Sequence, residues 1–280
     1  MEKVNAVIKR RALPLKERVC LMGILNVTPD SFSDGGKYLD PSRAVERAKR
    51  MVEEGADIID VGGESSRPGS RRVSAEEELG RILPVIKALS AEIEVPVSVD
   101  TYKSEVAREA LSCGASIIND ITALRGDPGM AGVIAGFGAG VALMHMKGIP
   151  GNMQDDTRYD DLLGEIYSYL EGSVRLAEAA GIASDRIMID PGIGFGKTAG
   201  QNFELLRGLS HFKKLGKPLL VGTSRKSFLG EVTGKGAGER IFGTAATVAA
   251  AIMNGADIVR VHDVGEMRDV ARVTRKIMGV

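Results

Sequence analysis

The stretch GADII, residues 55–59, joins a helical pattern to an apolar run, and two close variants of it occur later in the chain. GASII occupies residues 114–118 and GADIV occupies residues 255–259. In each copy, a glycine suited to the end of a helix leads into branched apolar residues, which are typical of a strand. A helix-to-strand junction that recurs in this way predicts a fold built from repeated strand and helix units.

Apolar runs of the same kind recur along the whole chain and predict eight strands. They occupy residues 19–25, 57–61, 96–99, 116–119, 140–145, 186–189, 218–221 and 257–261. The runs do not alternate polar and apolar residues, so both faces of the sheet should be buried, as in a parallel sheet. Eight strands alternating with helices over a chain near the usual length of about 250 residues predict a (β/α)8 TIM barrel. A doubly wound open sheet is the alternative.

Two of the predicted helices carry clear end signals. Pro41 opens one helix, whose apolar stripe ends at Gly55. Ser74 and Glu77 form the pattern of a capping box that opens a second helix, and Pro84 should bend or split that helix. Residues 1–17 precede the first strand and predict a short hairpin or arm that closes the barrel floor. No low-complexity linker divides residues 1–280, so we expect a single domain.

The composition bounds the classes of function. The chain has 280 residues, is 44% hydrophobic, and balances 37 Lys and Arg against 37 Asp and Glu. A chain without a net basic field is not expected to bind nucleic acid or an anionic membrane, and no apolar run reaches the length of a membrane helix. Cys20 and Cys113 lack CxxC spacing, and the N-terminus lacks a signal-peptide pattern, so we expect a cytoplasmic protein.

Polar residues follow the predicted strands at the edge where a barrel of this kind carries its site. Taken singly, such residues are more often helix caps or turn residues than ligand contacts. Together they place four cationic groups beside several carboxamide and carboxylate groups on one rim. The residues concerned are Arg67, Lys226, Arg260 and His262 with Asp100, Asn119 and Asp190, and Asn26 and His145 end two further strands.

The rim residues suit a ligand with two chemically different ends. Cationic side chains bind an oligophosphate, whereas Asp and Asn at strand ends suit the N–H groups of a planar heterocycle. We therefore expect a nucleotide-like or pterin-like phosphate ester. The segment PGIGFGKT, residues 191–198, imitates a phosphate-binding P-loop, but Pro191 stands where that pattern requires glycine. Asp263 and Glu266 beside His262 do not have zinc-ligand spacing.

Several longer motifs occur in order and together resemble the dihydropteroate synthase family. They are GILNVTPDSFSDGG, DVGGESSRPGS, VSVDTYK, IINDIT, MHMKG, IDPGIGFGKT, LVGTSRKSFLG and RVHDV, which lie between Val19 and Val264. The resemblance implies a (β/α)8 barrel, a homodimer and Mg²⁺. It also implies a transferase of folate biosynthesis that joins 6-hydroxymethyl-7,8-dihydropterin diphosphate to 4-aminobenzoate and releases diphosphate. No apolar helix face stands out in the sequence as a spare surface for the dimer.

The resemblance also implies roles for individual residues. Asp100, Asn119, Asp190 and Lys226 would bind the pterin; Asn26, Ser66, Arg260 and His262 would bind the diphosphate; and Asn26 would also contact Mg²⁺. Phe32, Ser66, Arg67, Pro68, Lys226 and Ser227 would form the aminobenzoate pocket, which sulfonamides imitate, and its closing loops. The catalytic group would be Asp100, Lys226, Arg260 and His262. The family often has Thr where this chain has Ser66, which keeps the hydroxyl and loses a methyl group.

Two other functions share parts of this pattern. A pterin-binding methyltransferase domain that acts with a corrinoid protein would need the heterocycle contacts, but it would not need the Ser-Arg-Lys-Ser loop or Phe32. A non-enzymatic pterin-binding or regulatory subunit would keep the fold without turnover. The implied reaction is an SN1-like displacement, in which cationic groups and Mg²⁺ stabilise the charge on the departing diphosphate.

Overall fold

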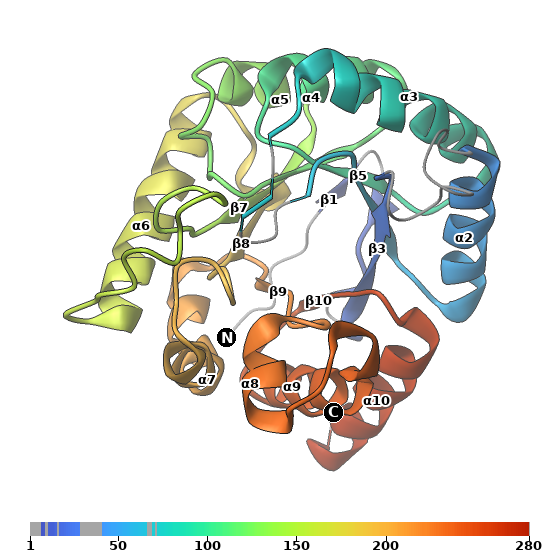
Figure 1. Cartoon of the computed structure of the whole chain (residues 1–280). Coiled ribbons are helices and arrows are strands. Elements are labelled where there is room, and N and C mark those ends of the chain that lie inside the picture. Colours follow the sequence, from blue (N-terminus) through green and yellow to red (C-terminus); the bar gives the residue numbers. More distant parts are fainter. Residues whose placement is uncertain are drawn as a thin grey trace.

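Eight parallel strands form a barrel in the computed structural model, which describes residues 7–8, 11–15, 17–28, 41–65, 69–70 and 72–279 (Figure 1). The strands are β3 (Cys20–Asn26), β4 (Ile58–Gly62), β5 (Val97–Asp100), β6 (Ile117–Asp120), β7 (Gly140–Met144), β8 (Ile187–Asp190), β9 (Leu220–Val221) and β10 (Ile258–Val261). Their order in the sheet is β8-β7-β6-β5-β4-β3-β10-β9. A parallel bridge between Ile189 and Leu219 joins the two ends of this sheet. The predicted barrel is confirmed, and the open-sheet alternative is wrong because the ends meet.

Helices surround the barrel on its outer side (Figure 1). They are α2 (Pro41–Glu54), α3 (Ala75–Glu92), α4 (Ser104–Ser112), α5 (Met130–Phe137), α6 (Leu162–Ala179), α7 (Ala199–Arg207), α8 (Ser227–Thr233), α9 (Ile241–Met253) and α10 (Val264–Ile277). Short 3-10 helices cover Ser184–Arg186, Leu209–Leu215 and Ala237–Glu239. Among the described residues, none of the helices combines the length and the apolar character needed to cross a membrane.

The three repeated junctions have the backbone conformation that their glycines suggested. Gly55, Gly114 and Gly255 have φ values of 110°, 115° and 102°, a region that side chains disfavour. Each glycine ends a helix, and the strand begins three residues later at Ile58, Ile117 or Ile258. The motif that predicted the fold therefore marks a real turn in the chain.

Helix α3, which Ser74 and Glu77 were predicted to open, follows these end signals only in part. The Ser74 hydroxyl accepts a hydrogen bond from the backbone N–H of Glu77 at 3.1 Å, as a capping residue does. The Glu77 carboxylate instead accepts from the Arg81 guanidinium, one turn further along the helix. Helix α3 runs without a break across Pro84, which is exposed, so the proline does not split it.

The barrel interior is apolar at the amino ends of the strands. Ten buried residues form this floor: Leu13, Leu15, Cys20, Met22, Ile58, Ile117, Ala142, Met188, Leu220 and Ile258. Leu13 and Leu15 come from the segment before β3, so the N-terminal region closes the barrel floor as predicted. Further toward the N-terminus, Val7–Ile8 and Arg11–Ala12 pair as an antiparallel hairpin.

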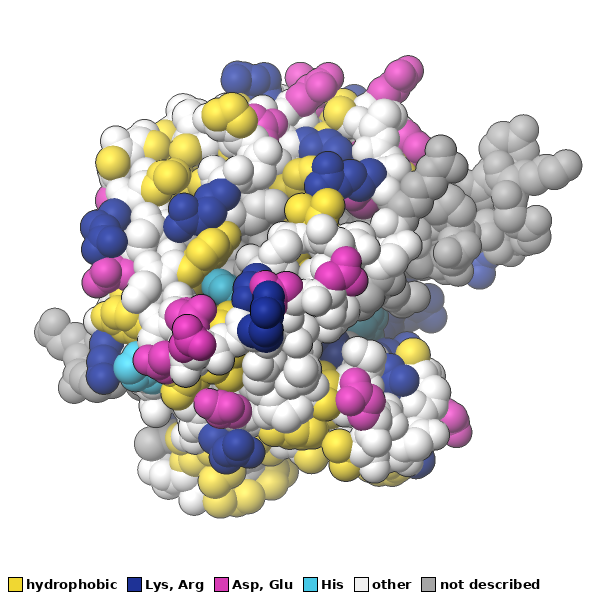
Figure 2. All heavy atoms as spheres, turned by 60° about the vertical axis from the view of Figure 1, so that its left-hand side comes forward, with side chains coloured by type: hydrophobic (Ala, Val, Ile, Leu, Met, Phe, Trp, Pro, Cys, Tyr) yellow, Lys and Arg dark blue, Asp and Glu magenta, His cyan; other side chains and the backbone are white. Residues whose placement is uncertain are grey.

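One helix face remains exposed although it is apolar. On α9, Phe242 is 78% exposed and Met253 is 56% exposed, and Val232 at the end of α8 is 68% exposed. Hydrophobic side chains gather at the lower end of the molecule in Figure 2, the end at which Figure 1 places α7 to α10. The sequence pattern did not reveal this face, because the small residues of α9 read equally well as buried.

The junction glycines allow a direct test of the fold. A Cβ at Gly114 would lie 2.4 Å from the Cβ of Ser90, and φ there is already unfavourable for a side chain. We expect Gly114→Ala to lower the free energy of unfolding by about 2–3 kcal/mol. Gly132→Ala is the matched control in urea unfolding, since a Cβ there meets nothing within 4 Å and should stabilise α5 slightly. Equal stability of the two variants would contradict the role of the junction.

Candidate active site

The alternation of strand side chains turns an apolar floor into a polar rim. Ile58 and Ile258 belong to the floor cluster, and two residues later the same strands carry Asp60 and Arg260. Because side chains two apart along a strand share a face, Asp60 and Arg260 also point into the barrel. In the order of the sheet, β3 lies between β4 and β10.

Arg260 lies between two carboxylates from other strands. Its Nε donates to Asp60 Oδ2 at 2.6 Å, and its Nη2 donates to Asp100 Oδ2 at 2.8 Å. Asp60 is completely buried, and the side chain of Arg260 is 18% exposed. A cation shared by two carboxylates offsets part of the cost of burying these charged groups.

Burial raises the pKa of Asp100 to about 7. The positive charge of Arg260 opposes this shift, while Asp60, Glu78 and Asp120 add to it. The Asp100 carboxylate therefore changes its protonation state close to neutral pH, where a ligand that donates N–H bonds would favour the ionised form.

Two further acceptors stand on neighbouring strands. Asn119 is buried and donates from Nδ2 to Asp60 Oδ2 at 3.1 Å. Asp190 is buried and accepts from the backbone N–H of Gly192 at 2.7 Å. Burial raises the pKa of Asp190, against the opposing charges of Lys226 and Arg260. The structure thus brings Asp100, Asn119 and Asp190 to one end of the barrel, as predicted.

Lys226 approaches the same region from the start of α8. Its amine donates to the backbone carbonyl of Ile193 and lies 4.7 Å from the centre of the Phe195 ring. Burial lowers its pKa to about 8, and the charge of Asp190 partly offsets that effect. Lys226 therefore ties the loop after β8 to the loop after β9.

Asn26 and Asp100 flank a glycine that leaves space between them. A Cβ at Gly62 would lie 3.7 Å from Asn26 Oδ1 and 3.6 Å from the Cβ of Asp100. Because Gly62 pairs with both Asn26 and Asp100 in register, a side chain at this position would fill the gap between the two polar groups. The glycine keeps the mouth of the barrel open there.

His262 is oriented through Ser224. The Ser224 hydroxyl lies 2.9 Å from His262 Nδ1 and also accepts from the His262 backbone N–H at 3.2 Å. The contact between the Ser224 hydroxyl and Nδ1 holds the imidazole ring in place, with the donor set by the tautomer of the ring. The backbone carbonyl of His262 accepts from Arg47 at 3.0 Å, which ties the rim to α2.

The P-loop-like segment has a structural role in this protein. The amine of Lys197 donates to the carbonyls of Gly192 and Phe195, both at 2.9 Å, and lies 3.0 Å from His145 Nδ1. The amine is therefore in contact with three protein groups. Burial lowers the pKa of Lys197 to about 7, and burial together with Lys197 lowers the pKa of His145. His145 is thus a buried partner of this lysine.

Some predicted residues remain untested by this geometry. Phe32, Ser66, Arg67 and Pro68 lie outside the described residues. Ser227 is described and is exposed at the first position of α8. The loop after β4, which carries residues 66–68, is described at its two ends.

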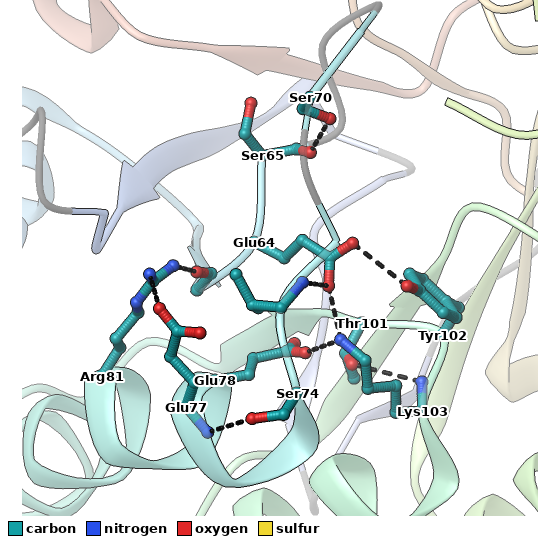
Figure 3. A network of polar contacts seen from close by, with 12 residues as sticks. Glu64, Ser65, Ser70, Ser74, Glu77, Glu78, Arg81, Thr101, Tyr102 and Lys103 are labelled. Carbon is teal, nitrogen blue, oxygen red and sulfur yellow. Dashed lines mark hydrogen bonds and ion pairs between the residues drawn. The ribbon is translucent and has the colours of Figure 1, made fainter. Parts of the chain in front are cut away.

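A polar network holds the two ends of that loop, and the sequence reasoning missed it (Figure 3). Glu64 accepts from the hydroxyl of Tyr102 at 3.1 Å, from the amine of Lys103 and, at 3.4 Å, from the backbone N–H of Val73. Lys103 also donates to Glu78, whose side chain is only 1% exposed. Glu64 therefore joins the start of the loop to its end, and Lys103 ties both to α3.

Asp60 was missed as well, although a signal for it exists in the sequence. It is an ionisable residue inside a strand whose neighbours Ile59 and Val61 are fully buried. A carboxylate at such a position needs a buried partner. No such rule identifies Lys103, because its two acidic partners come from distant parts of the sequence.

A resident metal centre built from several side chains is not seen in the described part of the chain. Within those residues, no group of three or more His, Cys, Asp or Glu side chains is placed to hold a metal ion. A Mg²⁺ ion that binds chiefly to substrate phosphates needs only one or two protein ligands. The oxygen of Asn26 is a suitable hard donor of this kind.

Comparisons with known proteins agree on one family. The family model described as pterin binding enzyme matches residues 22–262. A dihydropteroate synthase from Synechocystis is 50% identical over 258 residues, which cover 92% of this chain and 89% of that protein.

Solved structures give the same result. The dihydropteroate synthase of Yersinia pestis, in a sulfonamide complex, superposes with a TM-score of 0.93 at 43% identity and covers 99% of this chain and 100% of that one. The synthase of Xanthomonas albilineans with 4-aminobenzoic acid has a TM-score of 0.92 at 44% identity and full coverage of both chains.

The network around Glu64 predicts a loss of stability when its cation is removed. In Lys103→Met, Glu64 and Glu78 would face each other without the amine between them. We expect the free energy of unfolding in urea to fall by about 3 kcal/mol, because a buried carboxylate loses its partner. The double variant Lys103→Met/Glu78→Gln should lose less, since it also removes the most buried charge. If the free energy of unfolding of Lys103→Met lies within about 1 kcal/mol of the wild-type value, the network contributes little to stability.

Proposed function

The chain belongs to the dihydropteroate synthases of the pterin-binding enzyme family, and on that basis we propose how its side chains divide the work. The reaction condenses 6-hydroxymethyl-7,8-dihydropterin diphosphate with 4-aminobenzoate to 7,8-dihydropteroate and releases diphosphate, a step of folate biosynthesis. The observation that carries the proposal is the convergence of Asp100, Asn119 and Asp190 beside Arg260 and Lys226 inside one barrel mouth.

The pterin ring would bind at the buried acceptors. A pterin edge presents several N–H groups, and a carboxylate can accept two parallel N–H bonds. Asp100, Asn119 and Asp190 are held by the strands themselves, so they would be oriented before the ring arrives. Lys226, tied to the Ile193 carbonyl and beside the Phe195 ring, would close this side of the pocket.

The diphosphate would bind nearer the rim. Arg260 lies on β10 and His262 directly follows that strand, with Asn26 at the end of the adjacent β3. Ser66 would add a hydroxyl from the loop after β4. As the bond to the pterin methylene breaks, negative charge grows on the departing diphosphate. Groups that stabilise this charge lower the barrier, which suits an SN1-like displacement. Asp100, Lys226, Arg260 and His262 would form the catalytic group.

Mg²⁺ would accompany the diphosphate. The Asn26 oxygen, beside the open position at Gly62, is the donor that would hold it. When bound, the ion would supply further positive charge to the departing group. The chain itself places Asn26 at the end of β3 and leaves space beside it at Gly62.

The aminobenzoate pocket would lie outside the pterin site. Phe32, Ser66, Arg67, Pro68, Lys226 and Ser227 would line it, with the loops after β3 and β4 closing over the bound substrates. The Glu64 network supports this placement, because it anchors the loop after β4 close to Asp100. Sulfonamides, as mimics of aminobenzoate, would compete at this pocket.

The wider organisation follows from the same family. We propose that residues 1–280 form a single domain that acts in the cytoplasm as a homodimer. The exposed apolar face of α9 supports the dimer, since large apolar surfaces on soluble proteins mark interaction sites. The methyltransferase and regulatory alternatives receive no support from the comparisons, which name synthases.

The reaction itself gives the decisive experiment. The protein is mixed with the pterin diphosphate, 4-aminobenzoate and Mg²⁺, and diphosphate release is followed. We expect release only when the arylamine is present, loss of release with EDTA, and competition by a sulfonamide. Asp190→Ala should lose release because its ring contact is gone. Release that proceeds equally without the arylamine would refute the synthase function.

The dimer can be tested on the face that supports it. We expect Phe242→Glu to shift the protein toward the monomer in sedimentation velocity, because a charge would be buried in the interface. Phe137→Glu is the matched control, since Phe137 is 44% exposed on α5 and should leave the assembly unchanged. If both variants sediment like the wild type, α9 is not the interface.

A further inference from the structure

We infer that Asp60, which lies below the ligand-facing residues, determines which edge of the heterocycle the site accepts. The inference rests on the proposed pterin site and adds a residue that orients two of its members. Asp60 is completely buried at the middle of β4 and accepts hydrogen bonds from Asn119 and Arg260 through a single oxygen, Oδ2. It therefore acts on a ligand only through these two side chains.

The first effect of Asp60 is on which end of the Asn119 amide faces the ligand. An asparagine amide can present either its N–H donors or its oxygen acceptor to a ligand. Asp60 stands two residues before Gly62, and the register places Gly62, Asp100 and Asn119 in one row across the strands. Nδ2 of Asn119 donates to Asp60, which lies nearer the barrel floor, at 3.1 Å. The amide oxygen of Asn119 is therefore left to face a ligand beside Asp100.

This choice makes the three ligand-facing groups chemically alike. Asp100 and Asp190 are carboxylates, and an Asn119 that presents its oxygen adds a third acceptor. Three acceptors side by side bind a heterocycle edge rich in N–H groups, and they are left unpaired when a carbonyl replaces an amino group on that edge. The 2-amino group of a pterin is such a donor, and a 2-oxo ring lacks it. The Lys226 amine is the donor of the same site.

Its second effect is on Arg260. Asp60 engages Nε at 2.6 Å while Asp100 engages Nη2 at 2.8 Å, so contacts from two strands fix the plane of the guanidinium. A guanidinium fixed at two nitrogens keeps its remaining N–H groups in a defined direction. Asp60 thereby positions the cation as well as the amide.

The energetics favour a functional reason for this carboxylate. Within the described part of the chain, Asp60 Oδ1 has no hydrogen-bond partner, and neither has the hydroxyl of Ser98, which pairs with Asp60 in register. A buried carboxylate with one unsatisfied oxygen destabilises the fold relative to an apolar residue of similar size. Stability alone does not account for Asp60, whereas the orientation of Asn119 and Arg260 does.

The test uses a charge-conserving exchange. Asp60→Leu removes the acceptor and frees the Asn119 amide to rotate. Asp60→Leu/Asn119→Asp places a carboxylate acceptor at position 119 and keeps the same number of carboxylates in the barrel interior. Asp60→Asn retains one acceptor oxygen and removes only the charge. All are compared with the wild type by calorimetry with 6-hydroxymethylpterin and its 2-oxo analogue, after thermal melting confirms a folded protein.

We expect Asp60→Leu to bind the pterin about tenfold more weakly than the wild type, which corresponds to about 1.4 kcal/mol of binding free energy. This variant should also bind the pterin and the 2-oxo analogue with equal affinity. The double variant should regain affinity and preference, which a purely structural role would not produce. Pterin affinity within twofold of wild type in Asp60→Leu, or no recovery in the double variant, would overturn the inference. If Asp60→Leu does not fold, Asp60→Asn decides: we expect about threefold weaker binding, and unchanged affinity refutes the role.

These outcomes separate the inference from the function on which it rests. A wild-type protein that neither binds the pterin nor releases diphosphate with the arylamine would refute the proposed function itself. A wild-type protein that does both, with an Asp60→Leu variant of equal affinity and preference, would refute only the role of Asp60.

Discussion

Arg260 places one positive charge between carboxylates of two other strands, inside a barrel whose floor is apolar. Each of the three groups would be unfavourable there alone, because a buried charge without a partner loses its hydration. Together they form a connected set that reaches from β10 to β4 and β5 and continues to Asn119 on β6. The positions of the ligand-facing groups on these strands depend on this set.

The barrel tolerates these buried charges because apolar packing and polar groups occupy opposite ends of the strands. At the amino ends, the inward side chains and Leu13 and Leu15 fill the interior with apolar groups. At the carboxyl ends, several inward positions hold polar groups, such as Asp60 and Arg260, and Gly62 leaves the mouth open beside Asn26. Stability therefore comes mainly from the floor and from the helices outside, and the rim is free to carry groups that chemistry requires.

The loops at the rim are fixed by polar contacts, some within one loop and others between the ends of different strands. Lys103 and Glu64 hold the loop after β4, Lys197 holds the loop after β8 through two carbonyls, and Ser224 orients His262. The contacts of Lys197 with two carbonyls and with His145 give this lysine of the P-loop-like segment a structural role.

The sequence by itself determined the barrel, because branched apolar runs and junction glycines are local signals, and it determined the family through motifs such as DVGGESSRPGS. It also indicated Asp100, Asn119 and Asp190, since strand ends can be read from the pattern. Only the tertiary structure decided that Arg260 joins Asp60 to Asp100, that Lys103 lies between Glu64 and Glu78, and that α9 exposes Phe242. The physical reason is that a pairing between distant strands depends on the closed ring, which fixes register and facing side chains, whereas periodicity reports only which face each residue occupies.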